Sequence, residues 1–172
     1  MTLADGELNP AGEAARTWHA LQNKKEVYPE TLFRERTERA ELDPVFVWWH
    51  TLSHLLIRSV ALDSGYSGAS IRERIYTQTI GGLVQGGLII YTVQQGADGS
   101  LGGLISMVPR LERIFRRIAA EAGRCSNDPL CGANRVKPGS VSGSSCYACL
   151  LLSETSCEHR NMWLDRMVLL DS

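Results

Sequence analysis

The first 124 residues of the 172-residue chain contain no cysteine, and other absences are equally informative. Residues 1–7 lack the basic and apolar regions of a secretory signal peptide, which favours a reducing cytoplasm. Apolar runs such as 83–93 fall short of the ~20 residues that a bilayer helix needs, so no transmembrane span is expected. The formal net charge is −1, so no overall field attracts nucleic acid or anionic lipid. We therefore expect a cytoplasmic globular domain that contacts nucleic acid, if at all, through a local patch.

All five cysteines lie in one stretch near the C-terminus: Cys125, Cys131, Cys146, Cys149 and Cys157. The spacing of Cys146 and Cys149 allows two sulfurs to bind one cation from a tight turn, and flanking cysteines can complete a tetrahedral shell. We therefore predict a structural zinc ion held by four thiolates, with one cysteine to spare. Cys146 and Cys149 are expected ligands, and Cys157 with one or both of Cys125 and Cys131 supplies the rest. Disulfides and unrelated buried thiols are the alternatives, and a reducing compartment disfavours disulfides.

The segment between the two halves of this cysteine stretch is rich in glycine and serine. Residues 132–145 show no apolar periodicity, so no local core can hold the halves together. Structural zinc can supply ~10 kcal/mol or more of apparent binding free energy, which exceeds what such a segment gains from burial. A shell of four thiolates leaves no position for water, so the zinc is expected to be structural and not catalytic.

Helix signals dominate the chain before the cysteines. Residues 12–41 predict two short polar helices, the second beginning at Pro29, which form a peripheral element. Asp43 is a capping residue before a proline, and Gly65 is a suitable stop. The residues between them are apolar on most sides, which predicts a buried core helix.

The remaining elements are shorter. Ser70 and Glu73 have capping-box spacing, which predicts a helix from about 71 to 79. The other expected elements are a buried central strand at 88–93 followed by a loop at 94–99, a helix at 111–122, and a closing helix or helix-then-strand at 161–170. The predicted fold class is α+β: a mostly helical domain with a short buried strand region and a C-terminal four-cysteine zinc knuckle.

Two histidines lie four residues apart in the expected core helix. His50 and His54 point the same way from successive turns, a spacing that also occurs in metal sites. The residue after His50 is Thr51, whereas the catalytic zinc helix has glutamate there. We therefore favour imidazoles that are hydrogen-bonded in the core or at a subunit contact. A nucleic-acid-processing metalloenzyme that uses His50 and His54 is the alternative.

An arginine stripe follows the expected helix at 111–122. Arg110, Arg113 and Arg117 could neutralise phosphates, which would make binding salt-sensitive. Glu112 interrupts the patch, so a solvated helix face is the favoured interpretation and direct binding to DNA is the alternative.

Several ordered motifs together resemble a known family. They are His50-Thr-Leu-Ser-His54-Leu-Leu-Ile-Arg58, Ser70-Ile-Arg-Glu-Arg-Ile-Tyr76, Gly87-Leu-Ile-Ile-Tyr91, Asp98-Gly-Ser-Leu-Gly-Gly-Leu104, Cys125-Ser-Asn-Asp-Pro-Leu-Cys131, Ser145-Cys-Tyr-Ala-Cys149-Leu150, Thr155-Ser-Cys157-Glu-His-Arg-Asn161 and Leu164-Asp165-Arg166. Across about 44–170, this set resembles the MrfA-like zinc-binding domain found at the C-terminus of superfamily 2 helicases. It is most similar to the DrmB-type branch of DISARM-like bacterial anti-phage defence.

This resemblance carries implications that composition does not. It implies a zinc-binding domain at 43–172 with a metal module at 124–160, which leaves the helical N-terminal segment at 1–42 as the peripheral element expected from its composition. It implies zinc ligands at Cys146, Cys149 and Cys157, with Cys125 and Cys131 matching an upstream pair, and it transfers no catalytic residue. The chain contains no Walker phosphate-binding pattern. The implied role is therefore a non-catalytic accessory subunit whose partner is a superfamily 2 DNA helicase or translocase. A nuclease subunit is a further candidate partner, and DNA would be contacted through the complex.

Overall fold

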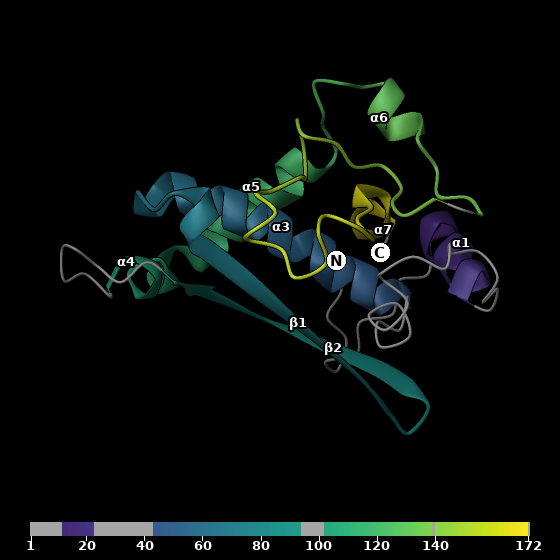
Figure 1. Cartoon of the computed structure of the whole chain (residues 1–172), viewed down its shortest axis with the longest axis horizontal. Coiled ribbons are helices and arrows are strands. Elements are labelled where there is room, and N and C mark those ends of the chain that lie inside the picture. The colour runs from purple at the N-terminus through teal and green to yellow at the C-terminus, as the bar shows by residue number, and fades with distance from the viewer. Residues whose placement is uncertain (1–11, 23–42, 94–101, 139, 172) are drawn as a thin grey trace.

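A single long helix, α3 (Pro44–Ser64), runs through the middle of the molecule (Figure 1). Its N-cap is Asp43, whose carboxylate accepts a 2.8 Å hydrogen bond from the Val45 amide, and its C-cap is Gly65 in the left-handed conformation. Both predicted boundaries of this helix are confirmed. The computed structural model describes residues 12–22, 43–93, 102–138 and 140–171. The predicted helix from Pro29 and the predicted loop at 94–99 lie outside these residues.

Burial of α3 explains its composition. Among the described residues, α3 is one helix that is long and apolar enough to cross a bilayer, whereas the lengths of the apolar runs predict none. However, 78% of its most apolar window is buried inside the domain. A helix that is apolar all round and enclosed in this way is typical of the core of a soluble protein.

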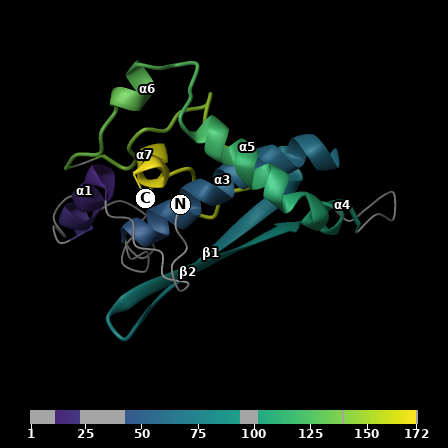
Figure 2. The same ribbon diagram turned by 180° about the vertical axis from the view of Figure 1, so that it is seen from behind.

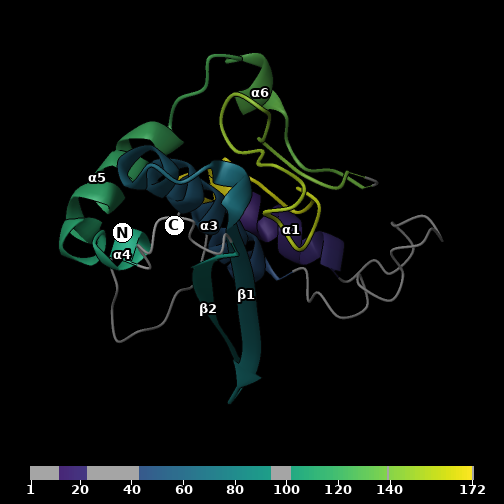
Figure 3. The ribbon, with the colours of Figure 1, turned by 60° about the vertical axis from the view of Figure 1, so that its left-hand side comes forward.

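The strand region is a two-stranded antiparallel hairpin. Strand β1 (Ile71–Ile80) pairs with β2 (Leu83–Thr92), and the turn uses Gly81 and Gly82, both with positive φ. Positive φ at both central residues is the geometry that matches the twist of hairpin strands, and glycine adopts it without strain. Figure 3 shows the hairpin extending away from the helices. The predicted helix at 71–79 is therefore wrong.

The side-chain pattern of β1 has a period of two and not of 3.6. Ile71 and Glu73 are fully buried, and Ile75 packs against the core, while the residues between them face outwards. The Ser70–Glu73 spacing suggested a helix start, but the alternation and the glycine pair favour a hairpin. The predicted buried central strand is also corrected: β2 is half-exposed, and Ile89 is 51% exposed.

One glycine sets how closely the hairpin approaches α3. A Cβ atom built on Gly86 would lie 2.2 Å from Cδ1 of Trp49, which projects from α3. No side chain fits at that distance, so the absence of a Cβ lets the indole pack directly on the β2 backbone.

The other elements are α1 (Glu13–Gln22), the 3₁₀ turn Gly68–Ser70, α4 (Gly102–Ile105), the 3₁₀ turn Val108–Arg110, α5 (Leu111–Ala122), α6 (Leu130–Ala133) and α7 (Arg166–Leu170). Of these, α1, α4, α5, α7 and the first 3₁₀ turn contact α3. The prediction of α5 is confirmed, whereas the closing helix is limited to α7. Figure 2 shows α5 lying along α3. The α+β class is confirmed, with helices around one core helix and a hairpin on it.

Helix α1 packs into the same core. Trp18 is fully buried, and its indole N–H donates a 3.0 Å hydrogen bond to Asp165, which caps α7. The Asp165 carboxylate also accepts hydrogen bonds from the amides of Ser144 and Met167, at 3.1 and 3.0 Å. This one carboxylate therefore joins α1, α7 and the loop that leads to Cys146.

Candidate metal centre

Four of the five cysteines converge on one point. The members of this cysteine cluster are Cys125, Cys131, Cys146 and Cys149. Their sulfur atoms all lie within 4.8 Å of one another, and three of the separations are 3.4, 3.7 and 3.7 Å. Sulfurs bound tetrahedrally at ~2.3 Å from zinc lie about 3.8 Å apart. The cluster therefore has the dimensions of a tetrahedral zinc site.

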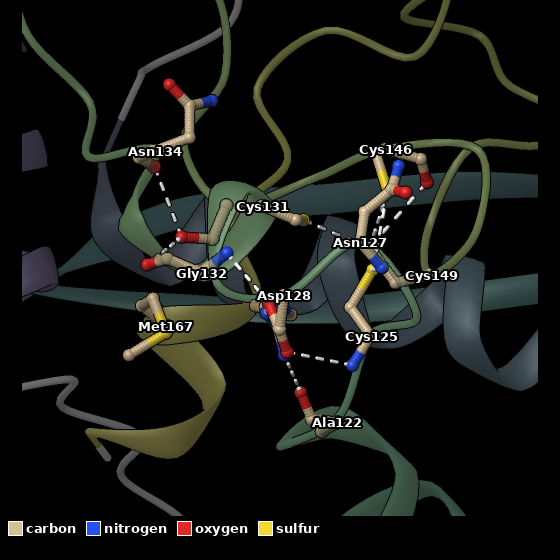
Figure 4. Close-up of polar contacts among 12 residues, drawn as sticks. Ala122, Cys125, Asn127, Asp128, Cys131, Gly132, Asn134, Cys146, Cys149 and Met167 are labelled. Carbon is tan, nitrogen blue, oxygen red and sulfur yellow. Dashed lines mark hydrogen bonds and ion pairs between the residues drawn. The ribbon is translucent and has the colours of Figure 1, made fainter.

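A tight turn presents the last two sulfurs. The carbonyl of Cys146 accepts hydrogen bonds from the amides of Cys149 and Leu150, at 3.1 and 2.9 Å. This turn places both side chains on its inner side, so residues three apart in sequence reach the same point. Figure 4 shows the sulfurs of the two halves of the chain facing one another.

Asp128 fixes the loop that carries the first two sulfurs. Its carboxylate accepts 2.9 and 2.8 Å hydrogen bonds from the amides of Cys125 and Gly132 (Figure 4). It also forms an ion pair with Arg166. Arg166 also donates to the Ala122 carbonyl at the end of α5. The loop is thus held by α7 and α5, which belong to the core.

Backbone and side-chain N–H groups surround the sulfurs. Asn127 donates from its amide to Cys125 and from its side chain to Cys146, at 3.4 and 3.7 Å. Burial opposes ionisation of Cys146, but hydrogen bonds from Cys125 and nearby amides lower its pKa to about 7. Burial raises the pKa of Cys149 to about 11 and that of Cys131 further. Four thiolates cannot coexist here without a compensating cation.

The disulfide alternative does not fit this geometry. All five thiols are free. The sulfurs of Cys125 and Cys146 are 3.4 Å apart, whereas a disulfide bond is ~2.05 Å long. Four soft thiolate donors at tetrahedral separations form a donor set that suits zinc.

The structure places Cys157 apart from the cysteine cluster. It lies with three other donors in a second group, the histidine cluster: His50, His54, Glu73 and Cys157. The expectation that Cys157 joins the same shell as Cys146 and Cys149 therefore does not match this arrangement. The reason is topological, because the chain between 150 and 157 leads away from the first cluster towards α3 and β1. The Ser156 carbonyl accepts a hydrogen bond from the amide of Glu73 on β1.

Glu73 is a further member of the site, although its capping-box spacing predicts a helix start. On β1 it is fully buried and points towards the two histidines. Burial opposes its ionisation, but the imidazoles of His50 and His54 hold its pKa well below the usual range. The alternation of Ile71 and Ile75 around it could have shown that the residue faces the core.

Two arginines of the stripe, Arg113 and Arg117, make contacts within the chain. The guanidinium of Arg117 donates to the Ser59 carbonyl at 2.9 Å and to Asp63 at 3.1 Å, which ties α5 to α3. Arg113 lies 3.7 Å from the same Asp63 carboxylate. Arg117 therefore contributes to packing, and Arg110 and Arg113 are the more exposed members of the stripe.

The closed cysteine cluster, presented on a helical core, defines a structural zinc-binding domain. The chain belongs to the MrfA Zn-binding domain family, whose model matches residues 52–150. That match includes all four members of the cysteine cluster, and the family and the donor set together support structural zinc as the cofactor.

A curated relative is also similar. The DISARM protein DrmB of Bacillus paralicheniformis (strain ATCC 9945a / NCIMB 11709 / CD-2) is 41% identical over 134 residues. The alignment covers 76% of this chain and 23% of that protein. The chain therefore corresponds to a minor part of the length of this relative.

Proposed function

We propose that this chain is a non-catalytic zinc-binding accessory component of a cytoplasmic bacterial anti-phage defence complex, and that it associates with a DNA helicase or translocase. The observation that carries the proposal is a closed thiolate cluster in a chain that is similar to a DISARM protein. The chain has no phosphate-binding loop pattern with its lysine. ATP would therefore be used by the partner.

Within this proposal, the cysteine cluster holds one structural zinc ion. Its four sulfurs have tetrahedral separations, and the described residues between 123 and 165 form only short helical turns and loops. The zinc-binding domain would extend over 43–172, with its metal module at 124–160. Helix α1, from the preceding segment, packs on this domain through Trp18.

The metalloenzyme alternative has less support from the geometry. A groove of about 750 Å³ runs along β1 and the loop around Cys157. However, the side chains of His50 and Glu73 have no exposed surface, so solvent in the groove does not reach their donor atoms. A hydrolytic metal site needs an open position for water or substrate. The histidine cluster is closed by four protein donors.

Copurification tests the proposed association. The chain, tagged at its natural locus, would be isolated from cells before and after phage challenge and analysed by mass spectrometry. We expect a stoichiometric ATPase with helicase signatures, and a nuclease subunit would be visible in the same experiment. Cys149→Ser should abolish the association, whereas Tyr147→Ser should preserve it, because Tyr147 lies in the same turn but is 83% exposed. Recovery of a lone monomer under all conditions would overturn the proposal.

A salt series separates direct DNA binding from binding through the complex. If the arginines of α5 contact phosphates, Arg110→Ala and Arg113→Ala should each reduce the slope of log affinity against log salt by about one. An unchanged slope would remove the direct contact and leave the accessory role intact.

A further inference from the structure

The histidine cluster brings together four donor atoms from three separate segments. His50 and His54 project from successive turns of α3, Glu73 from β1, and Cys157 from the loop that follows the cysteine cluster. All four donor atoms lie within 4.8 Å of one another, and all four residues are buried. The family model matches residues 52–150, so two of the four donors, His50 and Cys157, lie outside the matched region.

The separations are those of a metal-binding shell. The Nε2 atom of His50 lies 3.1 Å from Nε2 of His54, 2.9 Å from Oε1 of Glu73 and 3.2 Å from Sγ of Cys157. The Nε2 atom of His54 lies 3.3 Å from the same carboxylate oxygen. Ligands at tetrahedral positions around zinc, with bonds of ~2.0–2.3 Å, lie about 3.3 to 3.6 Å apart. The cluster is slightly contracted relative to that value.

Hydrogen bonds within the cluster join these atoms only in pairs. Nδ1 of His54 lies 3.0 Å from the Leu150 carbonyl, which can only accept, so this nitrogen carries the hydrogen and neutral His54 presents a lone pair at Nε2. Nε2 of His50 lies within 3.2 Å of three other donor atoms of the cluster, whereas its single N–H can point at only one of them. A cation at the centre of the cluster interacts with all four donors at once.

The charges of the four donors also favour a bound cation. A carboxylate and a thiolate carry two negative charges, and buried charges are strongly unfavourable unless they are compensated. A divalent cation neutralises both, while the two imidazoles bind as neutral ligands. The alternative is a metal-free ion pair between a protonated His50 and Glu73, which the same distances allow. The experiment below distinguishes these two states.

The surrounding groups orient three of the four donors. Besides the contact of His54 with Leu150, the second oxygen of Glu73 accepts a short hydrogen bond from Ser53, and Sγ of Cys157 accepts one from the Asn161 amide at 3.3 Å. Metal-binding histidines usually donate their other ring N–H to a carbonyl or carboxylate, and ligating carboxylates are themselves hydrogen-bonded. His54, Glu73 and Cys157 have this arrangement, whereas Nδ1 of His50 is buried without a hydrogen-bond partner among the described residues.

We propose that the histidine cluster binds a second zinc ion, which is structural and joins α3, β1 and the loop around Cys157. Two nitrogens, one oxygen and one sulfur form a donor set that suits zinc, and the four protein donors leave no open position. The two centres are adjacent in the chain, since Leu150 directly follows Cys149 and accepts the hydrogen bond from His54. The chain then carries two zinc ions of different coordination.

Zinc analysis of the wild-type chain tests this proposal without any substitution. The 172-residue chain, purified under reducing conditions, should contain two zinc ions per molecule. X-ray absorption at the zinc edge should give an average of about 2.5 sulfur ligands per zinc, with nitrogen or oxygen as the remainder. One zinc per chain with a shell of four sulfurs would overturn the proposal and leave the cysteine cluster as the sole zinc site.

Single substitutions then locate the second ion. His54→Gln should lower the zinc content from two to one and raise the average sulfur count towards four. The matched control, His19→Gln, changes an exposed histidine on α1 and should leave two zinc ions. If His54→Gln does not fold, the wild-type stoichiometry and absorption spectrum still decide the question. Retention of two zinc ions in folded His54→Gln would overturn the assignment.

Discussion

Replacing one ligand of the cysteine cluster should open the metal module. Cys149→Ser is the sharpest change, because Cys149 is buried and its sulfur lies 3.7 Å from the sulfurs of both Cys131 and Cys146. A neutral hydroxyl replaces a thiolate at the centre of the cluster. We expect zinc to be lost from this site and the segment around it to lose its fixed structure.

The loss of stability in Cys149→Ser depends on which other interactions hold the metal module in place. Between α5 and α7, the described residues contain one four-residue helix, α6, and no strand. Structural zinc contributes ~10 kcal/mol or more of apparent free energy, whereas whole domains are stable by only about 5–15 kcal/mol. Losing the ion removes this term, and a net loss of only half of it is about 5 kcal/mol. In a chain of this size, that loss lowers Tm by about 10–20 °C.

Three measurements check this expectation. Thermal melts followed by circular dichroism give the change in Tm, elemental analysis gives the zinc content, and hydrogen exchange reports on residues 125–164. Near-ultraviolet circular dichroism should also lose the signal of Trp163, which is buried against this module. Tyr147→Ser is the control, because it alters an exposed residue in the same turn and should keep zinc and Tm unchanged.

Two results would refute this reasoning. If Cys149→Ser loses zinc but keeps its Tm and its exchange protection, the metal does not hold the module together. If the variant keeps the full wild-type zinc content, Cys149 is not a ligand.

Three further predictions concern the metal and the core. Chelation under reducing conditions should remove zinc and make the metal module sensitive to protease, and added zinc should restore resistance; unchanged proteolysis would argue against a structural ion. Gly86→Ala should lower the urea midpoint by an amount that corresponds to about 1–3 kcal/mol of unfolding free energy, because its Cβ would lie 2.2 Å from the Trp49 ring. Gly87→Ala is the control and should leave the midpoint unchanged, because no atom lies within 4 Å of its Cβ. The hydrogen bond from Arg117 holds the pKa of Asp63 below its usual range. As pH falls, Asp63 is therefore protonated in the unfolded chain before it is protonated in the folded chain, and the stability that the Arg117–Asp63 pair contributes is lost. Asp63→Asn should therefore show a smaller fall in Tm between pH 6 and pH 3 than the wild type does, and equal slopes would contradict this assignment.

The helices could be predicted from sequence because their signals are local. Asp43 and Gly65 cap α3 within a few residues of its ends, and α5 ends where Gly123 follows its apolar face. The hairpin could not be predicted from the same kind of signal, because Ser70 and Glu73 have capping-box spacing in a segment that also alternates. Pairing with β2 and packing on α3 decide the outcome, and both are non-local.

The two donor groups show a similar division. The spacing of Cys146 and Cys149 identifies a turn that presents two sulfurs, and the structure has that turn. The position of Cys157 depends on where a loop returns after passing beside β1, which no spacing rule encodes. Glu73 joins His50 only through the contact between strand and helix. The cysteine content thus indicates a metal-binding domain. Which residues form each donor cluster can be determined only from the folded structure.

The long apolar α3 has a consequence for biosynthesis. During translation, this helix leaves the ribosome well before the segments that later enclose it, including α5, α7 and the cysteine turn. Until those segments are synthesised and metal is bound, the apolar surface of α3 remains exposed and can bind other chains or chaperones. Zinc supply during synthesis would thus govern yield, and cells starved of zinc should accumulate this chain as aggregate.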